Sequence, residues 1–406
     1  MTSQNDSESP IQPVRKKSLT LPRLILIFSM ALAVTAWLVG YFSGGSSAVA
    51  SVPDVLAGAV RIETRGSLFI GYGADGSIVG YAASGKSQGY GGPLEMLVGL
   101  DPKGEIIGVK LISQRETPGF FRLILAKDFF KQYSGKNFRD SLQLNQDLDA
   151  VSGATVSSEG IAASARDAIR LIAQQGLNVP LPPEARPIQF GIPEITLLGL
   201  YAAGYFGHKY SSGVWKRRVR WGTLLTGMIV LGFIYTAPLT IAQIIVLLSG
   251  YWPDWHNNLY WYLLIGGIIF VTTVDAKNPY CSWFCPFGAF QECLAQITNA
   301  KPYRSRRWGG IFTWLQRGLA FAAVLVGLAL RRPGVAGYEP FATLFDFRGN
   351  LIEVVFLLVV IVASLMMYRP FCNYLCPLDP VYDFIAESRR WLREGWQAWK
   401  KRTTKK

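Results

Sequence analysis

The sequence predicts an α+β domain outside a membrane and a polytopic α-helical membrane domain, with about six transmembrane helices in total. Three observations lead to this fold class. Half of the 406 residues are hydrophobic, and many fall in long apolar runs beside short basic clusters. The segment between Ser51 and Pro187 instead alternates short apolar runs with glycine-rich turns. Two related cysteine motifs follow apolar runs in the C-terminal half.

The charge distribution indicates a membrane protein. The formal net charge is +14, yet the segment from Ser51 to Pro187 contains fourteen basic and fourteen acidic residues and is neutral. The basic excess therefore lies in the N-terminal tail and the C-terminal part, in clusters that flank apolar runs. This pattern is typical of the cytoplasmic loops of membrane proteins and argues against nucleic-acid binding.

The first predicted span sets the expected orientation. Residues 1–20 form a cytoplasmic tail, and residues 21–43 form a transmembrane anchor. Leu24 to Phe42 is uncharged and follows a basic cluster, so the chain should enter the membrane from the cytoplasm and place the next domain outside. The triplet Ala48-Val49-Ala50 would allow signal cleavage, but the long apolar run favours an uncleaved anchor.

Residues 188–385 are predicted to form a membrane domain of five further helices. A basic cytoplasmic tail, residues 386–406, follows. Pro238 lies inside one of the five apolar runs and should kink that helix. The five expected spans are Ile188–Gly207, Trp221–Ser249, Leu259–Val274, Ile311–Leu330 and Leu351–Met367.

Some arginines need comment in this topology, and Arg348 would lie outside with the two named next. Arg331 and Arg332 would lie in an external loop, against the usual preference for basic residues inside. Arg317 lies within a predicted span near its cytoplasmic end. It is expected to extend its charge to the interface, and a contact with a quinone or a metal cluster is the alternative.

The predicted external domain covers residues 50–180 and has an α+β pattern. Short apolar runs at Leu68–Ile70, Ile78–Val79 and Ile106–Ile112 are expected to form strands. An amphipathic stretch from Ile161 to Ile172 is expected to form a helix. Strands followed by helices in one segment predict a sheet with helices packed on it.

The run from Asp149 to Ser158 carries the most specific chemical signal. It reads D-x-x-S-G-A-T-x-S, and the helix predicted after it would place Thr155 near a helix N-terminus, where backbone N–H groups favour anions. Gly153 and Ala154 are small enough to admit a bulky donor, and Asp149 offers a carboxylate near the hydroxyl. The alternative is an ordinary Ser/Thr-rich helix cap.

This run resembles the site where a flavin transferase esterifies the phosphate of FMN onto a threonine. Two further runs, Gly89 to Leu94 and Glu116 to Phe120, follow the order of the FMN-binding domain in the flavin subunits of the Rnf and Na+-pumping quinone reductase complexes and in NosR/NirI-type proteins. The resemblance covers roughly residues 55 to 176. It implies FMN linked to Thr155 by a phosphoester and surrounded by Asp149, Ser152, Gly153, Ala154, Ser157, Tyr90, Gly91, Gly92, Glu116, Thr117, Pro118 and Gly119.

One departure from this family pattern is visible. The flavin subunits often carry a histidine shortly before the Glu-Thr-Pro-Gly run, whereas Gln114-Arg115 stand there in this chain. The departure leaves the attachment site unaffected, but no proton-handling histidine is expected beside the flavin.

Two copies of the pattern Pro-aromatic-Cys-x3-Cys-Pro carry the second chemical signal. Each follows a predicted helical hairpin, so the membrane domain looks like a two-fold repeat. Cysteines four apart on a helical turn point the same way. Both motifs are expected in the reducing cytoplasm, where disulfides are rare. The predicted metal ligands are Cys281, Cys285, Cys372 and Cys376.

Four thiolates can bind one iron–sulfur cluster or one closed zinc site. The remaining alternative is that all four are buried structural cysteines without a metal. We favour a redox-active iron–sulfur cluster of the 4Fe–4S type, because both motifs recur in a chain that already carries a flavin signal. The remaining cysteine, Cys293, is expected to be a core residue rather than a fifth ligand.

These motifs resemble the C-x3-C-P pairs of NosR/NirI and quinol-dehydrogenase-like membrane proteins. The ferredoxin-like domain that often follows in NosR-type chains is absent from this sequence, which is therefore closer to the short flavin-plus-six-helix relatives found with reductive dehalogenases. The resemblance implies a flavoprotein of the bacterial cytoplasmic (inner) membrane that passes electrons from a cytoplasmic donor or quinol to FMN outside. Its implied partners are membrane lipid, a flavin transferase and an extracytoplasmic reductase, and a bound quinone is a further cofactor that it allows.

Two other classes of function remain open from the sequence. The protein could be a redox-sensing regulator or maturation factor for an external reductase, as the regulator label of NosR-type relatives suggests. It could also be a zinc-stabilised scaffold that carries flavin.

Overall fold

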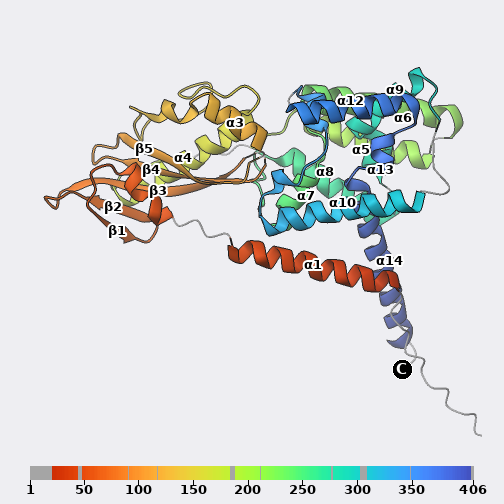
Figure 1. Cartoon of the computed structure of the whole chain (residues 1–406), viewed down its shortest axis with the longest axis horizontal. Coiled ribbons are helices and arrows are strands. Elements are labelled where there is room, and N and C mark those ends of the chain that lie inside the picture. The colour runs from red at the N-terminus through yellow and green to blue at the C-terminus, as the bar shows by residue number, and fades with distance from the viewer. Residues whose placement is uncertain are drawn as a thin grey trace, which may run out of the picture.

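The computed structural model describes residues 21–43, 48–89, 91–116, 118–182, 188–210, 212–275, 278–301, 309–347 and 349–403. A sheet domain and a bundle of helices lie end to end along the long axis of the molecule (Figure 1). The prediction of an α+β domain joined to a helical part is confirmed.

The sheet domain is built on a five-stranded antiparallel meander. Its strands are paired in chain order. The predicted apolar runs at Leu68, Ile78 and Ile106 lie in the second, third and fifth strands, respectively. The strands are β1 (Arg61–Arg65), β2 (Leu68–Tyr72), β3 (Ile78–Gln88), β4 (Pro93–Leu100) and β5 (Ile106–Gln114).

Alternation along the strands gives the sheet two apolar faces. On β4, Met96 and Val98 face the long helix α4 (Thr155–Gln175), which contains the predicted helical stretch. Leu97 faces the opposite side, where the short helix α2 (Val52–Val55) packs. The domain is completed by η1 (Ala48–Ser51), α3 (Pro118–Ala126) and η2 (Phe129–Tyr133).

Helix α4 lies very close to β3 because the contact uses small residues. A Cβ atom on Gly85 would lie 2.1 Å from the carbonyl oxygen of Ser164, so only glycine fits there. The Ser164 hydroxyl then donates to the carbonyl of Gly85 at 2.5 Å and accepts from the N–H of Met96 at 3.0 Å. These contacts fix the register of α4 on the sheet, and with it the position of the helix N-terminus.

The remaining helices form the bundle. Two described helices, over Arg23–Phe42 and Gly309–Ala329, are long and apolar enough to cross a membrane, and two shorter apolar helices cover Leu259–Val274 and Leu351–Met366. The elements outside the sheet domain are α1 (Leu21–Ser43), α5 (Ile192–Tyr210), α6 (Gly213–Thr226), π-helical η3 (Gly227–Ile234), α7 (Ile241–Leu248), α8 (Leu259–Asp275), π-helical η4 (Tyr280–Phe284), α9 (Pro286–Ile297), α10 (Gly309–Ala329), η5 (Pro333–Val335), α11 (Phe341–Phe345), α12 (Leu351–Met366), α13 (Pro370–Tyr374) and α14 (Leu378–Thr403).

The apolar run expected as one kinked helix over Trp221–Ser249 is instead broken in two. The helix ends at Ile234, Thr236 adopts a left-handed conformation with φ of 46°, and a new helix begins at Ile241. Pro238 cannot donate a backbone hydrogen bond, and Thr240 caps the new helix through a reciprocal bond with Gln243. Residues close to the break thus determine both the end of the first helix and the start of the second, and the helix is broken rather than kinked.

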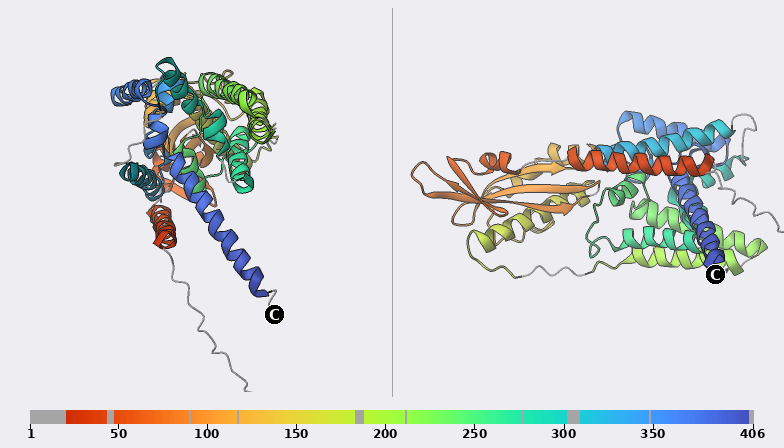
Figure 2. Two further views of the ribbon diagram at one scale, coloured as in Figure 1. Left: turned by 90° about the vertical axis from the view of Figure 1, so that its right-hand side faces the viewer. Right: turned by 90° about the horizontal axis from the view of Figure 1, so that it is seen from below.

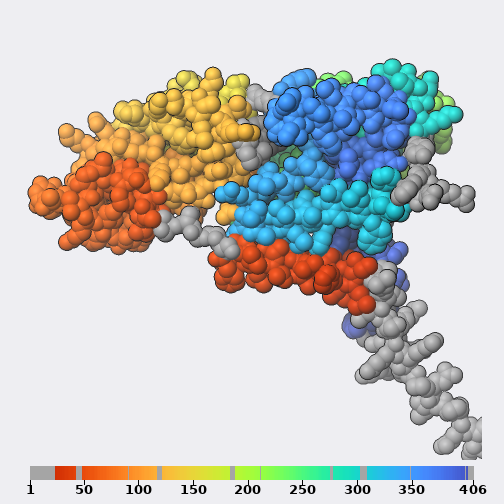
Figure 3. Space-filling view, in the orientation of Figure 1, coloured from red at the N-terminus to blue at the C-terminus, as the bar shows by residue number. Residues whose placement is uncertain are grey.

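Helix α1 runs along α10, although the two are far apart in the sequence (Figures 1 and 3). A Cβ atom on Gly40 would lie 2.2 Å from the carbonyl oxygen of Leu328, so the backbones approach closely at this end. The Arg331 guanidinium lies 5.6 Å above the ring of Tyr41 and 4.7 Å above the ring of Tyr251. The same arginine donates to the carbonyl of Ser249.

The sheet domain contacts the bundle at this same end through Arg115. Its guanidinium donates to the carbonyls of Leu330, at 3.3 Å, and of Arg331, and it lies 5.6 Å from the ring centre of Tyr251. Burial and the neighbouring charges of Arg331 and Arg332 lower the pKa of Arg115. Arg115 thus contacts the end of α10 and the loop that follows it.

Candidate cofactor sites

Thr155 is the first residue of α4 and is exposed to solvent. The preceding Gly153 has a φ of +81°, which turns the chain sharply into the helix. The helix cap is Ala154, which makes no side-chain hydrogen bond. The alternative interpretation of this run as a Ser/Thr helix cap is therefore wrong, and the Thr155 hydroxyl is not used to cap the helix.

The surroundings of Thr155 suit a phosphate group. The first backbone N–H groups of a helix have no partner within it, and the helix dipole adds partial positive charge there. Ser157 is buried, and its Oγ has no hydrogen-bond partner among the residues that the structure describes. The neighbouring Ser158 is occupied, because its Oγ accepts from the N–H of Val151 at 3.3 Å. Ser152 and Asp149 are exposed on the loop before the helix.

The glycine-rich loop packs against the same helix. The N–H of Gly91 donates to Oε2 of Glu116 at 3.0 Å, and Gly89 donates to the carbonyl of Gly92 at 2.9 Å. A Cβ on Gly89 would lie 1.7 Å from Glu116 Oε1, so the carboxylate occupies the space of an absent side chain. A Cβ on Gly160, in α4, would lie 3.0 Å from the Cα of Gly89.

Runs separated in the sequence are thus assembled around the start of α4. The glycine loop, the buried Glu116 and the first turns of α4 pack together, as the resemblance to an FMN-binding domain implies. Pro118 and Gly119 begin α3. Tyr90 and Thr117, which the sequence also nominates, lie outside the described residues.

The two cysteine motifs share one backbone hydrogen bond. The N–H of Cys285 donates to the carbonyl of Tyr280, and the N–H of Cys376 donates to that of Phe371, both at 2.8 Å. Each bond spans five residues, as in a π-helical turn. In the first motif the turn is π-helical and so wider than the α-helical turn expected, whereas in the second motif the same bond closes the end of the α-helix α13. The equivalent bonds in the two motifs support the two-fold repeat.

The four motif thiols lie within electrostatic range of one another. Burial is the largest cause that raises the pKa of each of them, and the charges on Cys285 and Cys372 raise the pKa of Cys281 further. Burial, and to a smaller extent the charge of Glu292, raises the pKa of Cys293, and no motif thiol is among the causes. Among the described residues, no group of three His, Cys, Asp or Glu side chains stands ready-made at metal-ligand spacing.

The donor set nevertheless fits an iron–sulfur cluster. Grouped thiolates without a cation would repel one another in a buried site, whereas a metal cluster compensates their charge. Two buried amides hold the second motif in place. Gln291 donates to Sγ of Cys372 at 3.2 Å and accepts from the N–H of Phe371 at 3.0 Å. Gln316 donates to the carbonyl of Cys372 at 3.2 Å and to that of Cys376 at 2.9 Å.

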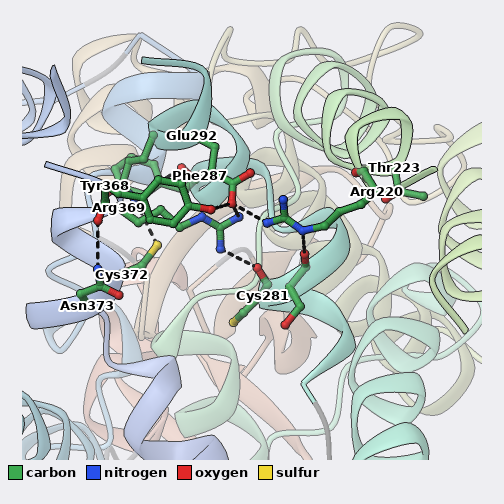
Figure 4. A network of polar contacts seen from close by, with 11 residues as sticks. Arg220, Thr223, Cys281, Phe287, Glu292, Tyr368, Arg369, Cys372 and Asn373 are labelled. Carbon is green, nitrogen blue, oxygen red and sulfur yellow. Dashed lines mark hydrogen bonds and ion pairs between the residues drawn. The ribbon is translucent and has the colours of Figure 1, made fainter. Parts of the chain in front are cut away.

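A buried carboxylate links the two motifs (Figure 4). Glu292, on α9, is 1% exposed and pairs with Arg220 from α6 and with Arg369, at 3.0 Å. Tyr368 donates to the same oxygen. Arg369 donates to the carbonyl of Cys281 at 2.9 Å, and Arg220 donates to that of Ser282 at 3.2 Å. Each arginine therefore holds the first motif by its backbone while sharing one carboxylate.

Sequence reasoning missed these supporting residues. Gln291, Glu292 and Gln316 are polar residues inside mostly apolar helices, and this was the feature of the sequence that could have revealed them. Such residues are costly to bury without partners, so they indicate a polar site between helices. Their partners, however, lie in distant parts of the chain.

Comparison with known proteins agrees with both sites. Residues 89–170 match the family model of an FMN-binding domain. Residues 257–309 and 350–395 match the model of a 4Fe-4S binding domain, so each half of the repeat is recognised. The cofactors implied by these domains are FMN and an iron–sulfur cluster.

Three curated relatives share parts of the chain. It is 30% identical to the protein NirI of Paracoccus denitrificans over 195 residues, which are 44% of this chain and 28% of NirI. It is 25% identical to the regulatory protein NosR of Pseudomonas aeruginosa over 194 residues, which are 44% of this chain and 27% of NosR. A third relative belongs to a proton-translocating ferredoxin:NAD(+) oxidoreductase complex of Clostridium ljungdahlii and is 30% identical over 21% of this chain and 50% of that protein. The chain thus matches about a quarter of the length of the first two relatives.

Proposed function

We propose that this NosR/NirI-like FMN-binding protein is an electron-transfer flavoprotein of the bacterial cytoplasmic membrane. Electrons would come from a cytoplasmic donor or quinol, pass through an iron–sulfur site on Cys281, Cys285, Cys372 and Cys376, and reach FMN outside. An extracytoplasmic reductase would then accept them. Bound FMN can exchange one or two electrons at a time, and the protein supplies position and electrostatic environment.

The observation that carries this proposal is the contact between the flavin domain and the bundle. A hydrocarbon core of about 30 Å would separate an outside flavin from a cytoplasmic cluster if the two domains were independent. Arg115 follows β5 and precedes the flavin-site carboxylate Glu116, and it donates directly to the end of α10. Docking would hold the flavin domain against one end of the bundle, and a quinone between the helices would bridge the distance to the cysteine site.

The residues proposed for FMN have distinct roles. Thr155 provides the hydroxyl that forms the phosphoester, and the start of α4 with Ser157 Oγ stabilises the phosphate charge. Asp149 would act on the incoming flavin donor during maturation by a flavin transferase. Glu116 fixes the glycine loop by accepting from Gly91, which leaves a backbone surface for the ring system.

Electron transfer through the chain can be measured directly. In the purified, flavinylated protein under anaerobic conditions, a low-potential ferredoxin or a quinol should bleach the flavin absorbance within the time of mixing. The Cys376→Ser variant should retain FMN but be reduced at least tenfold more slowly. Equal rates in the two proteins would contradict a path through the cysteine site.

The alternative function is a redox-sensing regulator or maturation factor. The name of the NosR relative, a regulatory protein, is the observation that favours it. A sensor would be reduced once and would not pass electrons on. Continuous consumption of quinol in the presence of an artificial external acceptor would support the carrier, whereas a single reduction without turnover would support the sensor.

The proposed orientation predicts which segments a protease can reach. A protease added to intact spheroplasts should cleave within residues 51–187 and leave the loops around Cys281 and Cys372 intact. An impermeant thiol reagent should likewise label these cysteines only after the membrane is opened. Labelling in intact spheroplasts would reverse the topology and the direction of electron flow.

A further inference from the structure

The last helix, α14, does not run with the other long helices of the bundle. It projects across them and away from the body of the molecule, beside the beginning of α1 (Figures 1 and 2). Its first turns are held by the bundle, since Leu378 is buried in the bundle core and Val381 packs against α7 and α10 residues. From Leu392 onward its described side chains are exposed.

Three polar contacts define where α14 crosses the bundle. Arg317, in the first half of α10, pairs with Asp383 at 3.0 Å. Arg389 donates to the carbonyl of Val274 at the end of α8, at 2.9 Å. Glu394 pairs with Arg23 at the start of α1, at 2.5 Å. In the proposed topology the end of α8, the start of α1 and the first half of α10 all lie toward the cytoplasmic side, so α14 follows that surface of the membrane.

The projecting half of α14 has the side chains of a helix at a membrane surface. Leu392, Trp396 and Trp399 recur at intervals of four and three residues and so form one stripe, and their exposed fractions are 68%, 62% and 61%. Residues 388–403 contain six basic residues and one acidic residue. Arg393 and Lys400 lie beside the apolar stripe on the helical wheel, where their long side chains can reach phosphate groups.

We propose that the C-terminal half of α14 binds the anionic phospholipid surface of the cytoplasmic leaflet as an in-plane amphipathic helix. Tryptophan favours the membrane interface, and the excess of basic residues complements anionic head groups. The stripe is a largely exposed apolar surface. The basic residues beside it and its position near the proposed cytoplasmic side of the bundle favour lipid over a protein partner. The inference rests on the proposed membrane orientation of the bundle.

Site-specific photo-crosslinking tests this assignment in the full chain. A benzophenone amino acid is placed at Trp396, on the stripe, or at Gln397, which is exposed on another face and serves as the matched control. The protein is studied in nanodiscs of phosphatidylcholine alone or mixed with phosphatidylglycerol. Lipid adducts detected by mass spectrometry should be several-fold more abundant at 396 than at 397, and more abundant with phosphatidylglycerol.

A charge variant separates lipid binding from folding. Arg393→Gln combined with Lys400→Gln should remove the preference for phosphatidylglycerol while FMN content and flavin reduction stay as in the wild type, because neither residue contacts the cofactor sites. Equal adducts at 396 and 397, or crosslinks from 396 to another protein in native membranes, would overturn the lipid assignment. Neither result would affect electron transfer in detergent, so the failure of this inference is distinguishable from failure of the proposed function.

Discussion

Replacing Thr155 with valine is expected to abolish covalent flavin completely. Valine keeps the shape of the side chain but removes the hydroxyl that forms the phosphoester. Because Thr155 is exposed and makes no cap bond, the change in folding stability should stay within about 0.5 kcal/mol. Protein co-expressed with a flavin transferase and exported should therefore lose its fluorescence on denaturing gels while its yield is unchanged.

Ser152→Ala provides the matched control for this variant. Ser152 is also an exposed hydroxyl on the same loop, and it lies three residues before the proposed acceptor. Its replacement should leave the fluorescent band. If the band survives in Thr155→Val and is lost in Ser152→Ala, the attachment site has been assigned to the wrong residue.

Replacing any one of Cys281, Cys285, Cys372 or Cys376 with serine is expected to remove the iron–sulfur signal. One site that draws ligands from both halves of the repeat leaves a cluster under-ligated when any thiolate is lost. Anaerobically purified wild-type protein should contain iron and acid-labile sulfide and give an EPR signal when reduced. Each single variant should lose most of that signal.

Cys293→Ser is the control for the cysteine series, because this thiol is electrostatically separate from the other four. It should leave both iron content and signal unchanged. Half of the signal surviving in each motif variant would instead indicate two clusters with outside ligands. Zinc without sulfide would reject the redox function of the bundle and leave only the flavin.

The strands, α4 and the flavin loop could be predicted from the local sequence. The residues that hold the cysteine motifs in place could not. The alternation of apolar residues and the position of Gly153 are readable within a few neighbouring residues. Glu292 is different, because its partners Arg220 and Tyr368 lie 72 and 76 residues away. One carboxylate in a mostly apolar helix indicates that a charged or hydrogen-bonding partner exists elsewhere, but it does not identify that partner in the sequence.

Two predictions made from the local sequence, for the Trp221–Ser249 run and for the first cysteine turn, were wrong. Hydropathy treats Trp221–Ser249 as one apolar run, whereas the helix ends at Ile234. Pro238 interrupts the backbone hydrogen bonding, and Thr240 caps a new helix. The spacing of Cys281 and Cys285 predicts an α-helical turn. The chain instead closes a wider turn and then leaves the helix at Cys285, with ψ of 119°.

The contact between α1 and α10 can form only after the flavin domain has been synthesised. The flavin domain lies between these helices in the sequence, so it emerges before the α10 residues that hold Gly40 and before the carbonyls that bind Arg115. Domains generally fold as they are synthesised, from the N-terminal side. In the proposed orientation, a newly exported flavin domain is therefore tethered but undocked, with the whole surface around Thr155 open to a modifying enzyme. The Arg115 contact can form only after the carbonyls at the end of α10 have been synthesised.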